Sequence, residues 1–253
     1  MTAKAHVLND IQKNTEEKAQ ATKQRNLNLV TTKKNTPSNF FYRVSDLAQL
    51  SKIGSSYLED FKNGIKSFAI TSTNYKASQQ RTVLALASYF DHMFDMKILI
   101  ISDSPDKGVF EEVMSAKKVE MTTIHGTNKK LEVNHFYHHF DLVDLNKLIG
   151  LTLTDKPSFD FEVIMDNVLK SYDIVFWDTP IINTHKNNSR IFSHAMSYFE
   201  SLTIIVSPMV SKATDVNEIK AHFQSFGVNV KGVLFDVPET VKEEKVKRWA
   251  NLE

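Results

Sequence analysis

Five short apolar runs, separated by longer segments with helical spacing, constrain the fold of this chain most. The runs are SFAITST (67–73), KILIISD (97–103), YDIVFWD (172–178), LTIIVSP (202–208) and VKGVLFD (230–236). They are largely apolar throughout instead of alternating, which is typical of strands covered on both faces. Strands that alternate with helices form parallel sheets through right-handed crossovers. The sequence therefore predicts an α/β domain with a mostly parallel central sheet flanked by helices.

The segments between these runs have the length and spacing of covering helices. They span residues 79–94, 158–170, 187–200 and 213–227. In the last segment, Val216, Ile219 and Phe223 recur at helical spacing, and Gly227 suits the position just past a helix end. Residues 43–62 predict one more helix that precedes the first strand.

Residues 104–160 have a less regular pattern. The stretches VEMTTIHG (119–126) and LEVNHFYHHFDLVDL (131–145) have the composition of strands and flank a turn-like GTNKK (126–130). This pattern predicts an inserted hairpin, and a helix over 140–149 is the alternative.

Charge and composition divide the chain unevenly. Residues 1–39 hold seven Lys/Arg and three Asp/Glu, a net +4, so residues 40–253 carry −3 of the total +1. The first segment has too little apolar surface to fold by itself, which predicts a flexible basic arm at 1–39 and a single α/β domain at 40–253. Weak attraction of the arm to anionic lipid or an acidic partner is the alternative. The body lacks the basic excess of nucleic-acid-binding proteins, so we expect no nucleic-acid partner.

Two absences suggest the compartment. No apolar stretch is long enough to cross a bilayer, and the N-terminus lacks the apolar core of a signal peptide. The chain has no cysteine, which agrees with a reducing compartment. We therefore expect a cytoplasmic protein.

The combination of KSFAITST, MKILIISDSP, SYDIVFWDTPII, SLTIIVSP and GVNVKGVLFDVP resembles the MinD/ParA superfamily of P-loop ATPases. Within it, the chain is most similar to bacterial tyrosine kinases and to ATPases of capsule and exopolysaccharide export. The resemblance covers about residues 40–238 and implies a Rossmann-like P-loop NTPase fold. It also implies that Asp178 matches the Walker B aspartate, which organises the magnesium water shell.

The phosphate-binding loop departs from the family pattern, which is similar to PGEGKST. Lys76 and Ser78 fall on the glycines, Gln79 on the essential lysine and Gln80 on the hydroxyl residue that binds magnesium. Side chains with a Cβ resist the positive φ values of such a loop, and neutral glutamine supplies no charge to a triphosphate. The resemblance therefore predicts a degenerate Walker A loop. The remaining positions of this degenerate nucleotide site are Asn74, where MinD-like loops carry a signature lysine, together with Tyr75, Arg81, Asp103 and Asp236.

Other family features are also incomplete. The second acidic strand has Ser102, Asp103 and Ser104 where the family has a pattern similar to DAD. The helix before the first strand offers Glu59 and Lys62 but lacks the arginines that make ring contacts in the kinases. The kinases phosphorylate a tyrosine-rich tail, whereas the last tyrosine here is Tyr198. These departures predict a pseudokinase.

Each candidate residue also has a simpler interpretation. Asp178 could still organise magnesium at the carboxyl end of a strand, or it could be a relic carboxylate that caps a loop. Lys76 and Arg81 could bind an anion in a rearranged loop, although a solvated surface role is favoured. The spacing of three histidines with an aspartate could support a metal site, but a packed strand is favoured; these residues are His135, His138, His139 and Asp141.

The favoured hypothesis is a catalytically inactive scaffold or regulator of exopolysaccharide (capsule) synthesis and export that acts through protein–protein interaction. The resemblance implies an inner-membrane polysaccharide co-polymerase as the partner, with recruitment to the inner membrane face, and self-association stays open. No cofactor is expected, and catalytic and metal residues are expected to be absent. One alternative is an ATPase or tyrosine kinase with a nonstandard loop, which would need ATP and magnesium held at Asp178. A ParA-like positioning protein of a polar machine is the other.

Overall fold

The computed structural model describes residues 47–73, 76–114, 118–123, 130–136, 140–151, 157–181, 195–207 and 211–236. The chain divides into Met1–Asn39 and Phe40–Glu253, and every described residue belongs to the second unit. The predicted flexible arm at 1–39 therefore lies outside the described residues, and the domain boundaries stay a prediction.

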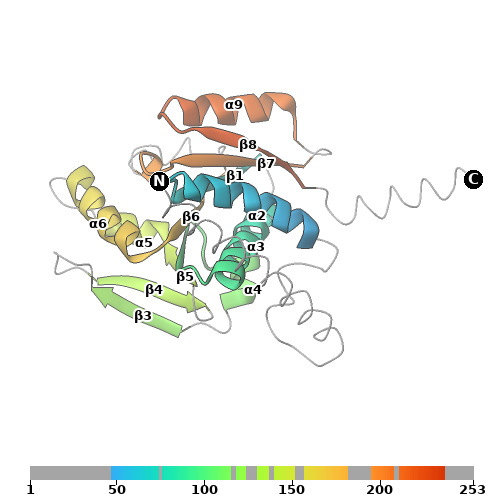
Figure 1. Cartoon of the computed structure of the whole chain (residues 1–253). Coiled ribbons are helices and arrows are strands. Elements are labelled where there is room, and N and C mark those ends of the chain that lie inside the picture. Colours follow the sequence, from blue (N-terminus) through green and yellow to red (C-terminus); the bar gives the residue numbers. More distant parts are fainter. Residues whose placement is uncertain are drawn as a thin grey trace, which may run out of the picture. The chain divides into compact units, whose positions relative to one another are not determined.

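Helices and strands alternate along most of the described chain (Figure 1). The helices are α2 (Leu47–Lys62), α3 (Lys76–Phe94), α4 (Val109–Met114), α5 (Leu145–Gly150), α6 (Pro157–Ser171) and α9 (Ala213–Gln224). The strands are β1 (Ser67–Ser72), β2 (Ile98–Ser102), β3 (Lys118–Thr123), β4 (Lys130–Phe136), β5 (Phe140–Asp144), β6 (Ile174–Asp178), β7 (Ser201–Val206) and β8 (Val230–Phe235). Each of the five apolar runs thus contains a strand.

These strands form one eight-stranded sheet in the order β3-β4-β5-β2-β6-β1-β7-β8. The six strands from β5 to β8 in this order are parallel. The hairpin of β3 and β4 extends the sheet antiparallel beside β5. The predicted α/β class with a mostly parallel sheet is confirmed.

The predictions for individual elements were mostly right. Four expected helices correspond to α2, α3, α6 and α9, and the inserted hairpin is β3 with β4. The alternative helix over 140–149 was wrong in its first half, because Phe140–Asp144 pairs with β2 as strand β5 and helix α5 begins only at Leu145. Of the helix expected at 187–200, residues 187–194 lie outside the described residues.

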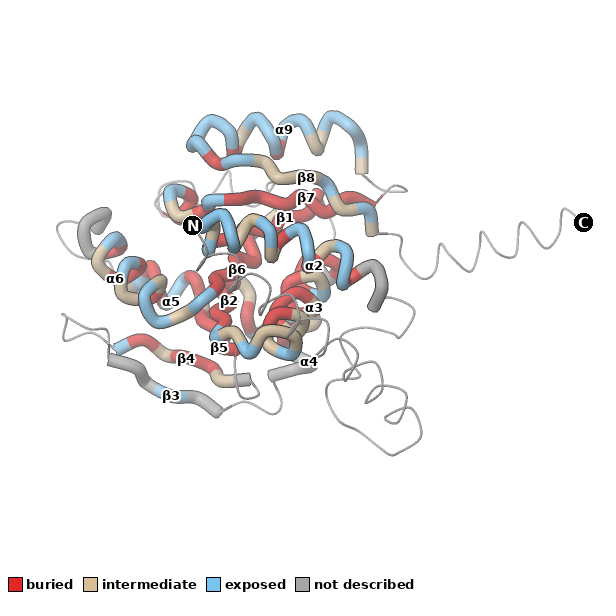
Figure 2. Tube along the Cα trace, viewed as in Figure 1, coloured by how far each residue is buried: buried red, intermediate tan, exposed pale blue. Residues whose placement is uncertain are grey.

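Two apolar cores pack on opposite faces of the sheet. Leu50 and Tyr57 of α2 pack with Leu84 and Phe90 of α3 on one face. On the other face, α5, α6 and α9 pack against the same strands. Every residue of β1, β2, β6 and β7 is buried, as the red strands in Figure 2 show. This burial on both faces explains why the apolar runs do not alternate with polar residues.

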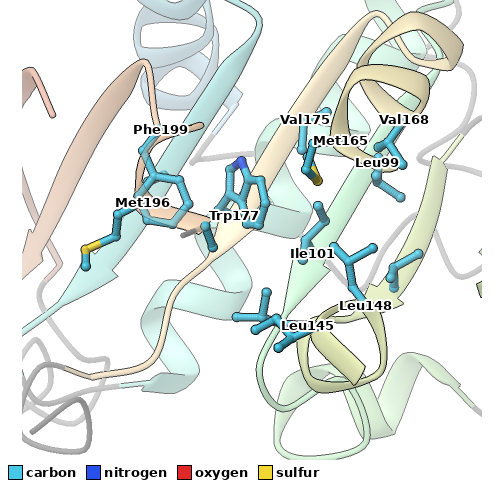
Figure 3. Packing of buried hydrophobic residues seen from close by; sticks show 14 of the residues in the cluster. Leu99, Ile101, Leu145, Leu148, Met165, Val168, Val175, Trp177, Met196 and Phe199 are labelled. Carbon is cyan, nitrogen blue, oxygen red and sulfur yellow. The ribbon is translucent and has the colours of Figure 1, made fainter. Parts of the chain in front are cut away.

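Trp177 anchors β6 in the second core. Its ring lies 5.0 Å from the ring of Phe199, and Figure 3 shows Met196 beside Phe199. The indole Nε1 donates to Ser67 Oγ over 2.8 Å. Because successive side chains of a strand point to opposite faces, the next residue, Asp178, points to the face that α3 covers.

Candidate functional site

Three polar residues lie at the carboxyl ends of neighbouring strands. Ser102 ends β2, Asp178 ends β6 and Ser72 ends β1, and these strands are adjacent in the sheet. Ser102 and Asp178 are direct partners in the parallel register. Helix α3 begins at Lys76, close after β1, so its first turn faces this edge. Ligands of open α/β sheets bind at such carboxyl ends, which makes this edge the candidate site.

Asp178 lies at the centre of the site and has no exposed surface. Its Oδ2 accepts a hydrogen bond of 2.6 Å from Ser102 Oγ, and its Oδ1 accepts one of 2.7 Å from Gln79 Nε2. The ammonium of Lys76 lies 3.0 Å from Oδ1. Both carboxylate oxygens are therefore bound by side chains of the protein itself.

The environment of Asp178 acts on its pKa in two directions. Burial raises the pKa because it disfavours the charged carboxylate, and this is the largest effect. The positive charge of Lys76 and the hydrogen bond from Ser102 oppose the rise, whereas the nearby charge of Asp103 adds to it. Lys76 is thus the main group that favours the ionised form of a carboxylate without access to solvent.

Lys76 connects three oxygen atoms. Its Nζ donates to Asp103 Oδ1 over 2.8 Å and to the carbonyl oxygen of Thr179 over 2.7 Å, besides its contact with Asp178. An ammonium has three N–H donors, and here each has an oxygen within reach. The solvated role that the sequence favoured for Lys76 was wrong, because the ammonium is ion-paired with two carboxylates and its side chain is only 22% exposed.

Gln79, which the resemblance aligns with the phosphate-binding lysine, is fully buried. Its Nε2 donates to Asp178 Oδ1 and, over 2.5 Å, to the carbonyl oxygen of Thr179. Its Oε1 accepts a hydrogen bond of 3.0 Å from Ser72 Oγ. The amide therefore links the ends of β1 and β6 to α3.

Gln80, also buried, connects α3 to the loop that follows β2. Its Oε1 accepts from the backbone N–H of Val109 over 2.9 Å, at the start of α4. Its Nε2 lies within 3.4 Å of the carbonyl oxygens of Ser104 and Lys107. A Cβ at Gly108, whose φ is +62°, would lie 2.6 Å from Gln80 Oε1, so this close approach favours glycine. The side-chain amide of Gln80 therefore holds the loop in place, and it has no hydroxyl that could bind a metal.

Not every predicted site residue joins this cluster. Ser78 is buried in α3, and its backbone carbonyl accepts from Thr82. Arg81 is exposed on α3 and has no ion pair among the described residues. Asp236 follows β8, and β7 and β1 separate that strand from β6. Asn74 and Tyr75 lie outside the described residues.

Two contributors to the site were not recognised from the sequence. One is the carbonyl oxygen of Thr179, which accepts from both Lys76 and Gln79. The other is the hydroxyl of Ser72, the last residue of β1. A polar residue at the end of a buried strand is the signal that could have indicated Ser72, whereas a backbone carbonyl leaves no signal in the sequence.

Of the histidines and the aspartate considered as metal ligands, the structure describes His135 and Asp141, which form a hydrogen-bonded pair. Nδ1 of His135 lies 2.5 Å from Asp141 Oδ1, and Tyr172 donates its hydroxyl to Asp141 Oδ2 over 2.6 Å. No group of three or more possible metal ligands occurs among the described residues. His138 and His139 lie outside them. The favoured packed strand agrees with β4, which contains His135.

In their present arrangement, the described residues do not fit a nucleoside triphosphate with magnesium. The two carboxylates that would face a cation, Asp103 and Asp178, already contact an ammonium. Gln79 is a neutral amide bound to Asp178, so it offers no charge to a phosphate. Any nucleotide would have to displace Lys76 and Gln79 from these contacts.

Comparisons with known proteins identify the fold. No protein-family model matches the sequence, and no curated protein matches it. The VpsO kinase domain aligns at 13% identity over 78% of this chain and 100% of that chain, with a TM-score of 0.52. The BceF tyrosine kinase domain aligns at 11% identity over 74% of this chain and 76% of that chain, with a TM-score of 0.51.

A ParA-family ATPase from Chlorobium tepidum aligns less closely, at 11% identity over 68% of this chain and 72% of that chain, with a TM-score of 0.49. The protein thus shares the P-loop fold of bacterial tyrosine kinase domains, as the resemblance implied. Within the residues that the structure describes, no helix is long and apolar enough to cross a membrane.

Proposed function

We propose that this protein is a catalytically inactive scaffold or regulator that acts through protein–protein interaction in exopolysaccharide (capsule) synthesis and export. The main support is the hydrogen bond from Gln79 to Asp178, at the position where the family has its phosphate-binding lysine. The second support is Lys76, whose ammonium pairs with Asp103 and Asp178.

Phosphoryl transfer explains why these contacts matter. Its transition state spreads negative charge over the phosphoryl oxygens, so catalysis needs metal ions and positive groups aimed at those oxygens. In this site the one described cation near Asp178 is bound to protein oxygens. Gln79 and Lys76 therefore stabilise the edge of the sheet, and neither offers a positive charge to a substrate as arranged.

The partner and the pathway come from the family resemblance. The proposed partner is the cytoplasmic end of an inner-membrane polysaccharide co-polymerase, which would recruit the protein to the inner membrane face. Such binding needs a folded surface and no turnover, and the closed network of hydrogen bonds favours a single conformation.

A nonstandard ATPase or kinase is the second candidate. It would require Lys76 to leave Asp103 and Asp178 and to contact a phosphate, with magnesium at Asp178. The position of Lys76 in the first turn of α3 favours this candidate, because phosphates bind at helix amino ends. A ParA-like positioning protein is the third candidate and has no particular support in the site.

Thermal unfolding with ATP and magnesium tests the proposal. A ligand at about 100 times its Kd stabilises the folded state by about 2.7 kcal/mol. We expect no shift for the protein or for Asp178→Ala beyond the effect of magnesium alone. A shift that Asp178→Ala abolishes and that the exposed control Asp106→Ala keeps would favour the ATPase candidate and refute the scaffold.

A further inference from the structure

A hollow of about 770 Å³, lined by charged residues together with Leu169 and Tyr172, lies at the amino-terminal edge of the sheet, opposite the site described above. The residues just before β2, β6 and β1 meet there because these strands are neighbours: Lys97, Asp173 and Lys66. The end of α6 supplies Lys170 and the following Tyr172. The parallel topology thus brings three lysines from three parts of the chain to one hollow.

The backbone holds two of these lysines in fixed positions. The N–H of Asp173 donates to the carbonyl oxygen of Lys97 over 2.8 Å, and the N–H of Val175 donates to that of Lys66 over 2.8 Å. Both lysines therefore lie on either side of the start of β6. The backbone positions from which the two exposed side chains extend are therefore fixed by the sheet.

The nearby carboxylates of Asp173 and Glu200 bond to backbone N–H groups and not to the lysine ammonium groups. Asp173 Oδ2 accepts from the backbone N–H of Lys97 over 2.8 Å, and Glu200 Oε2 accepts from that of Lys66 over 2.6 Å. Among the described residues, no carboxylate lies within ion-pair distance of the ammonium groups of Lys66, Lys97 or Lys170. These three positive charges are thus available to an anion.

An aromatic ring forms part of the hollow. The ammonium of Lys97 lies 5.0 Å from the ring centroid of Tyr172, and the Tyr172 hydroxyl donates to Asp141. Contact with the ring restricts where this ammonium lies. The side chains of Asp166 and Ser171 also line the hollow and can bond to hydroxyl groups.

We infer that this hollow binds the phosphate ester of a polyhydroxy alcohol. The three ammonium groups would contact the phosphate, and Asp166 and Ser171 would bond to the hydroxyls. The volume lies within the range of small-molecule sites, about 300–1,000 Å³. A soluble sugar phosphate and the headgroup of phosphatidylglycerol share this chemistry. The inference does not depend on the proposed scaffold function.

The test uses the full chain and two probes, glucose 1-phosphate in calorimetric titration and phosphatidylglycerol vesicles in cosedimentation. The variant Lys66→Gln/Lys97→Gln/Lys170→Gln removes the three charges of the hollow. The matched control Lys52→Gln/Lys62→Gln/Lys220→Gln removes three exposed lysines elsewhere. Phosphatidylcholine vesicles and glucose serve as controls without the phosphate anion.

We expect at least one probe to bind and the hollow variant to bind it at least about tenfold more weakly, since hydrogen bonds between charged partners are stronger than neutral ones. The control should bind like the unmodified chain. Binding of the sugar phosphate alone assigns a soluble ligand, and binding of vesicles alone assigns a headgroup. Absence of binding to both probes, or equal weakening in both variants, would overturn the inference. The single variant Lys97→Gln repeats the test if the triple variant does not fold.

Discussion

The side-chain amide of Gln79 donates to Asp178 Oδ1 over 2.7 Å, and both residues are fully buried. The resemblance to P-loop ATPases implies that Gln79 falls on the phosphate-binding lysine and Asp178 on the Walker B aspartate. Because both side chains are buried and each satisfies the other, this contact belongs to the structural core. Its loss should therefore affect stability more than any activity.

Gln79→Ala should lower the free energy of unfolding by about 2–3 kcal/mol. The substitution removes the hydrogen-bond acceptor of Ser72 and one of the donors to Asp178 and to the Thr179 carbonyl, which keep Lys76, and it leaves a cavity in place of a buried side chain. Denaturant unfolding measures the change. The exposed Gln224→Ala in α9 should change little, and an equal effect of both substitutions would contradict the structural role of Gln79.

Lys76→Met should destabilise the protein more as the pH rises. Burial already raises the pKa of Asp178 and Lys76 lowers it, so the variant raises that pKa further. A carboxyl with a raised folded-state pKa contributes its full stability below the unfolded pKa and loses it as the pH rises through the folded pKa. We expect a small loss at about pH 4 and a loss of about 3 kcal/mol at about pH 8. Unfolding curves of Lys76→Met and the exposed control Lys220→Met at both pH values check this, and a loss independent of pH would contradict it.

Gly54→Ala should destabilise the contact between α2 and α3. A Cβ at Gly54 would lie 2.3 Å from Cε1 of Tyr89, so the ring would have to move. Overpacking of this kind costs about 1–3 kcal/mol. Gly150→Ala is the matched control, because a Cβ at Gly150 has no heavy atom within 4 Å. Thermal unfolding compares the two, and Tyr89→Ala should relieve the effect of Gly54→Ala.

Alkaline pH should destabilise the protein through the buried Tyr57 and the partly buried Tyr198. Burial holds the pKa of Tyr57 far above its usual range, against the opposing hydrogen bond to Thr203, and burial raises the pKa of Tyr198 to about 12. The unfolded chain loses these protons near pH 10 while the folded chain keeps them, so stability falls as the pH rises above about 10. Tyr57→Phe removes one such group and should make the fall less steep by about 1.4 kcal/mol per pH unit. An unchanged slope would show that Tyr57 ionises equally in both states.

The sequence predicted the fold well because the relevant signal is local. A continuous apolar run such as IVFW before Asp178 is typical of a strand that is buried on both faces. Such a strand can be recognised from its own residues, without knowing which strands lie beside it. The register that places Ser102 beside Asp178 was not predictable, because it depends on which strands become neighbours. Of the predicted site residues, Lys76, Gln79, Asp103 and Asp178 lie together in the structure, and the nucleotide role assigned to them stays a prediction. The ion pairs of Lys76 were not predictable, because they depend on contacts between distant parts of the chain.

Restoration of the loop tests whether the site descends from a phosphate-binding one. The substitutions are Tyr75→Pro, Lys76→Gly, Ala77→Glu, Ser78→Gly, Gln79→Lys, Gln80→Ser and Arg81→Thr. They introduce glycines that permit the loop, a lysine for the phosphates and a hydroxyl for magnesium. They also remove the ammonium of Lys76 from Asp103 and Asp178, so a cation no longer competes with that ammonium, and the lysine introduced at position 79 is meant for the phosphates.

We expect this variant to gain weak, magnesium-dependent ATP affinity without catalysis, because a nucleotide site needs both a shaped loop and a cation, whereas turnover also needs an acceptor. Calorimetric titration with ATP and magnesium measures the gain. Asp178→Ala in the same background should abolish it, and Asp106→Ala should not. If the variant keeps a cooperative unfolding transition but binds no ATP, the edge of the sheet does not retain the shape of a phosphate site. The network around Asp178 would then be an original structural feature of this chain and not a replacement for lost nucleotide contacts.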